Sequence, residues 1–431
     1  MPRDVEQLAK QVLVLHSIGR PLMEDTIRAL GELKKCHDRG LRRGSVDLRE
    51  FSFWAKVTVS CFFAHVTAVA SIMRKNVQLF HSFSDVTPTA REIAKLVGRR
   101  YDKDADDVSR QWTRPLSTTD SLKLGFRLFA RQIGAEFSLN TGDGRFRGLV
   151  NLQTARRRFT HPERIEDLYA PGMVGNLQSS LAWFYSEFQR FIHAAQAALG
   201  VAGLPTAAEE PKGKPLKPVD IDERQLFTDE ELNDQIVLGG RTLSYIKHFF
   251  RVLRYDGTRA AKMRKRAGNK DNALGQFARR VILRVHATQL EALSNAVWFL
   301  LDSARTMREV EFRDSDLEPE ADLPAKLGLL VARVNVWSSR TGSGQKISLD
   351  DGAKNQLAAA WKKRDKLVHP LLPKDIEFKR LDALRAALAL YDLECKALEC
   401  MWVDPDRLQA AYERGLATRG ENIPPLAPGA S

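Results

Sequence analysis

Two stretches of the sequence decide the fold: DGRFRGLVNLQTARRRFTHP, residues 143–162, and DGAKNQLAAAWKKRDKLVHP, residues 351–370. Each begins with Asp-Gly, continues with the apolar spacing of a helix and ends in Arg-x4-His-Pro. The residue before a proline is disfavoured in the helical conformation, so each helix is expected to end at its histidine. The two stretches therefore predict a repeated helix with an arginine in its last turns and a histidine at its end.

The repeat continues into the helix that follows each stretch. Apolar residues recur there at spacings of 4, 3, 4, 3 and 4, which is typical of a helix that buries one face in a bundle. The two stripes, offset by 207 residues, are Leu177, Leu181, Phe184, Phe188, Phe191, Ala195 and Leu384, Leu388, Tyr391, Cys395, Leu398, Trp402. A long apolar helix is expected before each stretch, at roughly 51–75 and 284–308. We therefore expect two copies of a helical bundle.

The helical period prevails along the chain and strand-like alternation is scarce, so we expect an all-α protein. Pro21 is expected to start the second of two short helices near the N-terminus. The expected parts are N-terminal helices at 1–44, a first bundle at 45–200, a Pro-rich linker at 201–240, a basic segment at 241–280, a second bundle at 281–403 and a C-terminal tail at 404–431.

Composition and charge limit the classes of function. The chain has 431 residues, 43% of them hydrophobic, as in a globular protein of two or three domains. Lys and Arg number 67 against 54 acids, and the net charge of +13 favours a polyanionic partner. The four cysteines lack zinc spacing, so we expect no metal and no cofactor. The N-terminus lacks a signal peptide and the longest uncharged run, 57–73, is short for a membrane span. We expect a cytoplasmic protein with no membrane partner.

A basic segment precedes the second long helix. Residues 241–284 hold 13 Lys or Arg and two acids, with Tyr245, Phe249, Phe250, Tyr255 and Phe277 interleaved. Cations combined with stacking rings suit single-stranded RNA. The residues expected to contact RNA are Arg254, Arg259, Lys262, Arg264, Lys265 and Arg266. The alternative is a basic solvated helix with its aromatic rings in the core.

The repeated motif resembles that of the HEPN superfamily, whose four-helix bundles carry Arg-x4–6-His near the end of the third helix. The resemblance covers roughly 45–200 and 281–403. The residues that carry it are Arg156, His161 and Pro162 in the first half, and Arg364, His369 and Pro370 in the second. The family often has Asn, Asp or His directly after the arginine. Asp365 fits this habit as a supporting residue, whereas Arg157 departs from it.

This resemblance implies a ribonuclease. Many members are RNases of toxin–antitoxin, abortive-infection and CRISPR systems, and paired domains bring two motifs into one cleft. A tandem pair in one chain resembles the RNA-guided RNases of type VI CRISPR systems. The implied activity is metal-independent endonucleolytic cleavage of single-stranded RNA in prokaryotic antiviral defence, with Arg156, His161, Arg364 and His369 as catalytic residues. A guide RNA, or an antitoxin protein if the chain is a toxin, would be a further partner.

The chemistry needs only these side chains, because RNA supplies its own nucleophile, the 2′-hydroxyl. A histidine that titrates near neutrality can accept or donate the proton, and an arginine presents a permanently charged fork to phosphate. The expected products carry 2′,3′-cyclic phosphate and 5′-hydroxyl ends. Two alternatives stay open: a non-catalytic RNA- or nucleotide-binding helical protein, and a structural protein in which arginine and histidine cap helix ends.

Overall fold

The predicted all-α class is confirmed by a computed structural model of the protein. The residues that the structure describes are 3–43, 46–80, 88–97, 116–163, 165–169, 173–200, 216, 237–238, 241–268, 272–341, 344–401, 410, 413 and 417. Within these ranges nearly everything regular is helix, apart from the antiparallel pair β1 (Val237–Leu238) and β2 (Arg241–Thr242). Most of the predicted linker and tail, and Trp402, lie outside the described residues.

The chain divides into two compact units, each assembled from three stretches of sequence. Unit 1 comprises Met1–Arg156, Gly172–Val219 and Asp365–Phe378, and unit 2 comprises Arg157–Pro171, Asp220–Arg364 and Lys379–Ser431. The boundary between the units falls inside both Arg-x4-His motifs, directly after each arginine. The predicted pair of contiguous HEPN-like domains stays a prediction.

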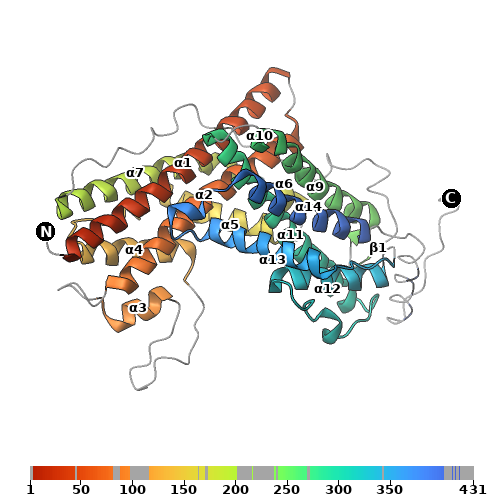
Figure 1. Ribbon diagram of the computed structural model, residues 1–431. Helices are drawn as coiled ribbons and strands as arrows, with labels where there is room; N and C mark the ends of the chain where they lie inside the picture. The colour runs from red at the N-terminus through yellow and green to blue at the C-terminus, as the bar shows by residue number, and fades with distance from the viewer. Residues whose placement is uncertain are drawn as a thin grey trace. The chain divides into compact units, whose positions relative to one another are not determined.

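Unit 1 is built around α2 (Leu48–Phe80), which packs along α1 (Arg3–Arg43), as Figure 1 shows. The prediction of two short N-terminal helices was wrong, because α1 is one helix with Pro21 inside it. Proline inside a helix removes one hydrogen bond at a cost of about 3 kcal/mol. The apolar residues on either side of the proline, Ile18 and Leu22, are fully buried and offset that cost.

The remaining helices of unit 1 are α3 (Ala90–Val97), α4 (Thr118–Gln132), α7 (Met173–Leu199) and the part of α5 (Gly144–Thr160) up to Arg156, with the short turn η3 (Pro373–Asp375). α2 contacts α3, α4 and α7. It is long and apolar enough over Leu48–Gln78 to cross a membrane by composition, yet 83% of its most apolar window is buried inside the structure. This burial is that of a core helix and fits a soluble protein.

Unit 2 is built around α11 (Ala273–Thr306). Its other helices are α6 (Ile165–Tyr169), α9 (Leu243–Lys262), α10 (Arg264–Gly268), α12 (Ala325–Arg340), α14 (Arg380–Cys400), the part of α13 (Asp351–Val368) up to Arg364, and the turn η2 (Asp314–Leu317). α11 contacts α9, α10, α12 and α14. The first turns of both α9 and α11 are capped by side chains, because Thr242 and Asn272 each accept a backbone amide of the helix that follows.

The internal similarity extends over five helices, two more than the three that the sequence revealed. α2 contacts α1, α4 and α7, and α11 contacts the corresponding helices α9, α12 and α14. α4 also contacts α7, just as α12 contacts α14. We call α1, α2, α4, α5 and α7 the first copy and α9, α11, α12, α13 and α14 the second copy. Each central helix therefore contacts three helices that follow the same order along the chain, and the two HEPN-like bundles stay a prediction.

The buried face of the last helix was predicted correctly in the first copy and wrongly in the second. The stripe of α7 that begins with Leu177 is buried throughout. In α14 the predicted stripe is partly exposed, with Leu388 at 42%. The residues of α14 that are buried at the same spacings are Ala383, Ala387, Leu390, Glu394, Ala397 and Met401. The correct offset is therefore 206, and the error of one residue rotates the helix by about 100°.

Candidate functional site

Both motifs close their helices as predicted. α5 ends at Thr160 and α13 ends at Val368, immediately before the two histidines. The amide of each histidine still donates to the carbonyl four residues earlier, at 2.8 Å in both copies. The proline that follows fixes its own backbone and restricts the histidine before it, so the helix cannot continue.

The two motifs also share their burial, position by position. The arginine is half-buried, the next two residues are exposed, and the histidine is exposed beside a buried proline. The position two before the histidine, Phe159 or Leu367, is buried and fixes each helix end to the core. Each motif therefore has an arginine held by the protein and a histidine presented at the surface.

In unit 1, the first arginine and the second histidine lie against the same helix, α2. The Arg156 guanidinium lies 5.4 Å from the centre of the Phe63 ring. His369 Nδ1 lies 3.5 Å from the hydroxyl of Ser71. Phe63 and Ser71 are eight residues apart, about 12 Å along a helix axis. The structure therefore places both motif residues on α2 without showing a contact between them.

In unit 2, the second arginine is held by a carboxylate of α11. Arg364 Nη2 donates to Glu291 Oε1 at 2.7 Å, and Lys326 Nζ contacts the same oxygen at 2.7 Å. Both partners of the arginine pair are largely buried, and the guanidinium also lies 4.9 Å from the centre of the Trp361 ring. Charge-assisted hydrogen bonds of this kind are short and strong, so Arg364 has a defined position.

The first histidine lies close to the same carboxylate. The negative charge of Glu291 raises the pKa of His161, but desolvation is the largest influence and leaves the pKa below its ordinary value. The cations Arg157, Lys326 and Arg333 lower it further. His161 is exposed in part, and the surrounding protein still removes enough water to favour the neutral ring. A neutral imidazole near neutral pH can accept a proton.

The end of α5 is fixed at this place by α11. Asn295 Nδ2 donates to the carbonyl of Thr160 at 2.8 Å, directly before His161. Asn295 lies one turn after Glu291, so one face of α11 holds both the helix end and the carboxylate. Within unit 2, Glu291 thus pairs with Arg364 of one motif and acts by its charge on His161 of the other.

Sequence reasoning missed Glu291, Lys326 and Arg333. Glu291 is the only acid between residues 272 and 301, so a lone carboxylate in a long apolar helix was the available signal. Lys326 and Arg333 are seven residues apart on α12, a spacing that places them on one face. Arg333 donates to Ser294 of α11, and desolvation lowers its pKa.

Asp365, predicted as a supporting residue, is exposed, and its backbone carbonyl accepts the amide of His369. Its supporting role, like the catalytic roles of the four motif residues, stays a prediction. Within the described ranges, no group of three or more His, Cys, Asp or Glu residues could hold a metal ion. All four cysteines are free thiols.

The predicted RNA-binding residues lie on α9 and α10. Arg259 is half-buried, and the exposed ones are Arg254, Lys262, Arg264, Lys265 and Arg266. The interleaved aromatic rings are less available than expected. Phe249 and Phe277 are buried, and Phe250 packs edge-on against Trp337. A buried ring cannot stack on a base, so Phe249 and Phe277 belong to the core, as the alternative interpretation had it.

No family model, no curated protein and no solved structure matches the chain.

Proposed function

We propose that the protein is a metal-independent endoribonuclease that cleaves single-stranded RNA with one composite site built from both Arg-x4-His motifs. The observation that supports this most is Glu291 in unit 2, which pairs with Arg364 of one motif and whose charge acts on His161 of the other. A histidine and an arginine from different copies are what a composite site requires. Helix capping alone gives no reason for one carboxylate to act on both.

The proposed reaction begins at the 2′-hydroxyl of RNA. His161, kept neutral by desolvation, takes the hydroxyl proton. The 2′-oxygen then attacks the adjacent phosphorus, the bond from phosphorus to the 5′-oxygen breaks, and the leaving oxygen takes a proton from His369. The products carry a 2′,3′-cyclic phosphate and a 5′-hydroxyl. Arg156 and Arg364 bind the phosphate oxygens whose charge grows in the transition state.

Glu291 is a positioning residue in this scheme. Its carboxylate accepts hydrogen bonds from Arg364 and Lys326 where no RNA is present. A phosphate offers the same kind of acceptor to the same two cations, so bound RNA would compete with Glu291 for them. The carboxylate thereby keeps Arg364 ordered before the substrate arrives, which reduces the entropy lost on binding.

The wider role that we propose is prokaryotic antiviral defence, as a HEPN-type nuclease that a guide RNA directs or an antitoxin restrains. The second candidate is a non-catalytic RNA-binding protein. It is favoured by the exposed cations of α9 and α10 and by Arg157 standing where the HEPN motif often has Asn, Asp or His.

The test is incubation of the purified full chain with 5′-labelled single-stranded RNA in EDTA, followed by end-group analysis. We expect cleavage that leaves 2′,3′-cyclic phosphate and 5′-hydroxyl ends. DNA of the same sequence should remain intact, because it lacks the 2′-hydroxyl.

Binding of RNA without cleavage would favour the second candidate. Products with 5′-phosphate ends, or cleavage that requires added metal, would contradict the proposed chemistry. Protein with both histidines replaced by alanine, purified in parallel, is the control for contaminating RNase.

A further inference from the structure

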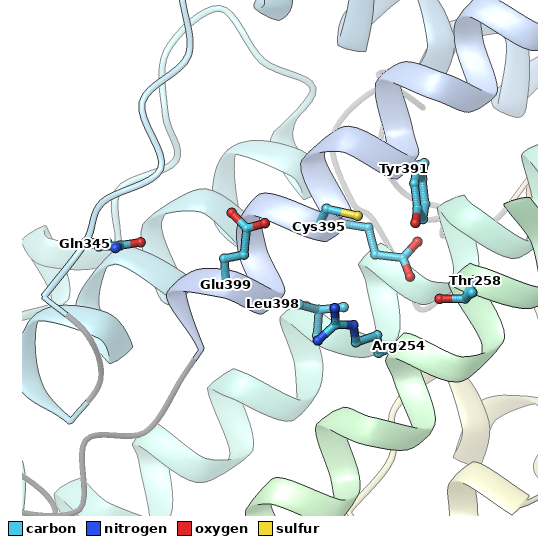
Figure 2. A pocket seen from close by; sticks show the side chains of 8 residues that line it. Arg254, Thr258, Gln345, Tyr391, Cys395, Leu398 and Glu399 are labelled. Atoms are coloured by element: carbon cyan, nitrogen blue, oxygen red, sulfur yellow. The ribbon is translucent and has the colours of Figure 1, made fainter.

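A hollow of about 700 Å³ opens in unit 2 between α9 and α14. Its lining residues are Arg254, Thr258, Gln345, Tyr391, Glu394, Cys395, Leu398 and Glu399. Figure 2 shows the Tyr391 hydroxyl and the Thr258 side chain directed toward the same region. Pockets of this volume hold small molecules. None of the lining residues belongs to the candidate site at Glu291.

The corresponding face of the last helix is covered in the described part of the first copy. With the offset of 206, Tyr391 corresponds to Tyr185 and Leu398 to Ile192, both of which are buried. α1, which covers that face of the first copy, has 41 residues, whereas its counterpart α9 has 20. The second copy therefore leaves open a face of its last helix that the first copy closes.

The chemistry of the wall also differs between the copies. Phe188 of the first copy packs against Gly19 and His65. In the second copy Glu394 stands at this position, 2% exposed, and accepts a hydrogen bond from His286 Nδ1 at 2.9 Å. Desolvation raises the pKa of Glu394 above its ordinary value, against the lowering by the hydrogen bond and the charge of His286, and the charge of Asp256 raises it further.

Glu394 is not explained by stability. Replacing a buried polar pair by well-packed apolar residues is often neutral or stabilising, and the first copy shows that phenylalanine fits this position. Gly257 of α9 leaves the space that the carboxylate occupies, since a Cβ atom there would collide with it. The second copy thus keeps a carboxylate that reaches the wall of the hollow, where it can accept hydrogen bonds from a ligand.

Cations lie at the same pocket. Arg254 is exposed and lines the hollow, and the Arg264 guanidinium lies 5.6 Å from the centre of the Tyr391 ring. Opposite charges in one pocket suit a ligand with hydrogen-bond donors at one end and an anion at the other. Leu398 and Cys395 supply apolar surface between them.

We propose that this pocket binds a nucleotide and prefers guanine. The ionised form of Glu394, which the hydrogen bond from His286 favours, only accepts hydrogen bonds. The Watson–Crick edge of guanine offers two neighbouring donors, the N1–H and the 2-amino group. Adenine offers one donor beside an acceptor, which would face the Glu394 oxygens unfavourably. The phosphate would bind Arg254, since a guanidinium matches phosphate oxygens in charge and geometry. This function goes beyond the proposed cleavage and does not depend on it.

The test is calorimetric titration of the full chain with GMP, AMP and guanosine in the absence of RNA. We expect GMP to bind one site per chain and to bind more tightly than AMP. Arg254→Ala should weaken GMP about tenfold or more, the value of a charge-assisted hydrogen bond, and leave guanosine binding unchanged. Arg251→Ala, an exposed arginine one turn earlier on α9, is the matched control.

Glu394→Gln should remove the preference for GMP over AMP, with folding checked by circular dichroism. Arg254 is exposed, so its variant remains informative even if the Glu394 variant is unstable. Absence of GMP binding at millimolar concentration, or equal binding by wild type and the Arg254 variant, would overturn the proposal. Equal binding of GMP and AMP would overturn the guanine preference.

The source of the nucleotide is assigned by competition. Short RNA oligomers with and without guanine are added to the GMP complex. Displacement by the guanine-containing oligomer alone assigns the pocket to a base of RNA, and no displacement assigns it to a free nucleotide. Both results keep the pocket, and neither requires that the protein cleave RNA.

Discussion

The last helices of the two copies, α7 and α14, occupy the same place in the five-helix arrangement but bury different side chains. α7 buries three phenylalanines, Phe184, Phe188 and Phe191, and closes the core of unit 1. At the corresponding positions α14 buries Leu390, Glu394 and Ala397, and it leaves larger residues such as Leu388 partly exposed. The same backbone arrangement is therefore filled by aromatic rings in one copy and left open in the other.

The central helices differ in the same direction. His65 of α2 lies beside Gly19 of α1, and His286 of α11 is bonded to Glu394, which lies beside Gly257 of α9. We therefore match His65 with His286, and the same offset matches Ala70 with Glu291. The second copy thus carries the carboxylate that holds Arg364, and the first copy has a methyl group there. Buried polar groups cost free energy unless they are paired. The carboxylate of Glu291 meets this condition, because it is paired with Arg364 and Lys326.

The largest effect that we expect is on cleavage. Arg364→Ala and His161→Ala should each reduce the rate of RNA cleavage by about 10²–10⁴-fold, the usual contribution of a placed acid or base, with a similar loss for the arginine. The measurement is single-turnover cleavage of labelled RNA.

The matched control is Lys362→Ala, an exposed residue two positions before Arg364 on α13. Arg364→Ala also breaks the ion pair with Glu291, at a cost of about 1.5–3 kcal/mol, so the unfolding free energy is measured in parallel. Equal activity of Arg364→Ala and Lys362→Ala would remove the arginine from the site.

The second prediction tests the register of the last helices. Leu181 and Leu388 were matched by the sequence repeat, but Leu181 is fully buried and Leu388 is 42% exposed. Leu181→Ala should lower the unfolding free energy by about 2–5 kcal/mol, and Leu388→Ala by only about 0.5 kcal/mol. Urea denaturation measures both. Similar losses in the two variants would mean that the offset of 207 holds after all.

The third prediction concerns the exposed cations of α10, which follows α9 in unit 2. Arg264, Lys265 and Arg266 are exposed on α10. Replacing all three by alanine should weaken binding of single-stranded RNA and reduce the slope of log affinity against log salt by up to ~2, at ~0.7 per phosphate. Fluorescence anisotropy at several salt concentrations gives the slope. An unchanged slope would show that these cations do not contact phosphate.

The smallest effect is a shift in pH dependence. His161 must be neutral to act as base, so cleavage is present above its pKa and is lost as the pH falls through that pKa. Glu291 raises this pKa against the larger lowering by desolvation. Glu291→Gln should therefore move the acidic limb of the rate profile to lower pH. Asp302→Asn on the same helix is the control, and a shift to higher pH would contradict the geometry.

The sequence was sufficient for the all-α class, the repeat and the ends of the motif helices, because Pro162 and Pro370 determine where α5 and α13 stop. It was insufficient for the register of α14. Alanine faces carry little hydrophobic contrast, so the larger residues Leu388 and Tyr391 suggested the wrong face. The burial of Ala383, Ala387 and Ala397 in the structure is what reveals the buried face of α14.

The sequence also predicted only part of the candidate site. The two motif histidines and arginines stood out by their repeated spacing, whereas Glu291 has no partner in sequence and is recognised only when Arg364 is seen beside it. The aromatic residues of the basic segment suggested stacking on RNA bases, but periodicity does not tell whether Phe249 faces the core or the solvent. Burial decides that Phe249 is a core residue.

The most direct test of a shared site is the double-mutant cycle of His161→Ala and His369→Ala in single-turnover cleavage. Residues that act as one unit are strongly non-additive. If the two copies contribute to one composite site, each single variant should lose most activity and the double variant should be little worse than either. If the losses instead multiply, each motif works by itself. A wild-type rate in the double variant would contradict the nuclease function altogether.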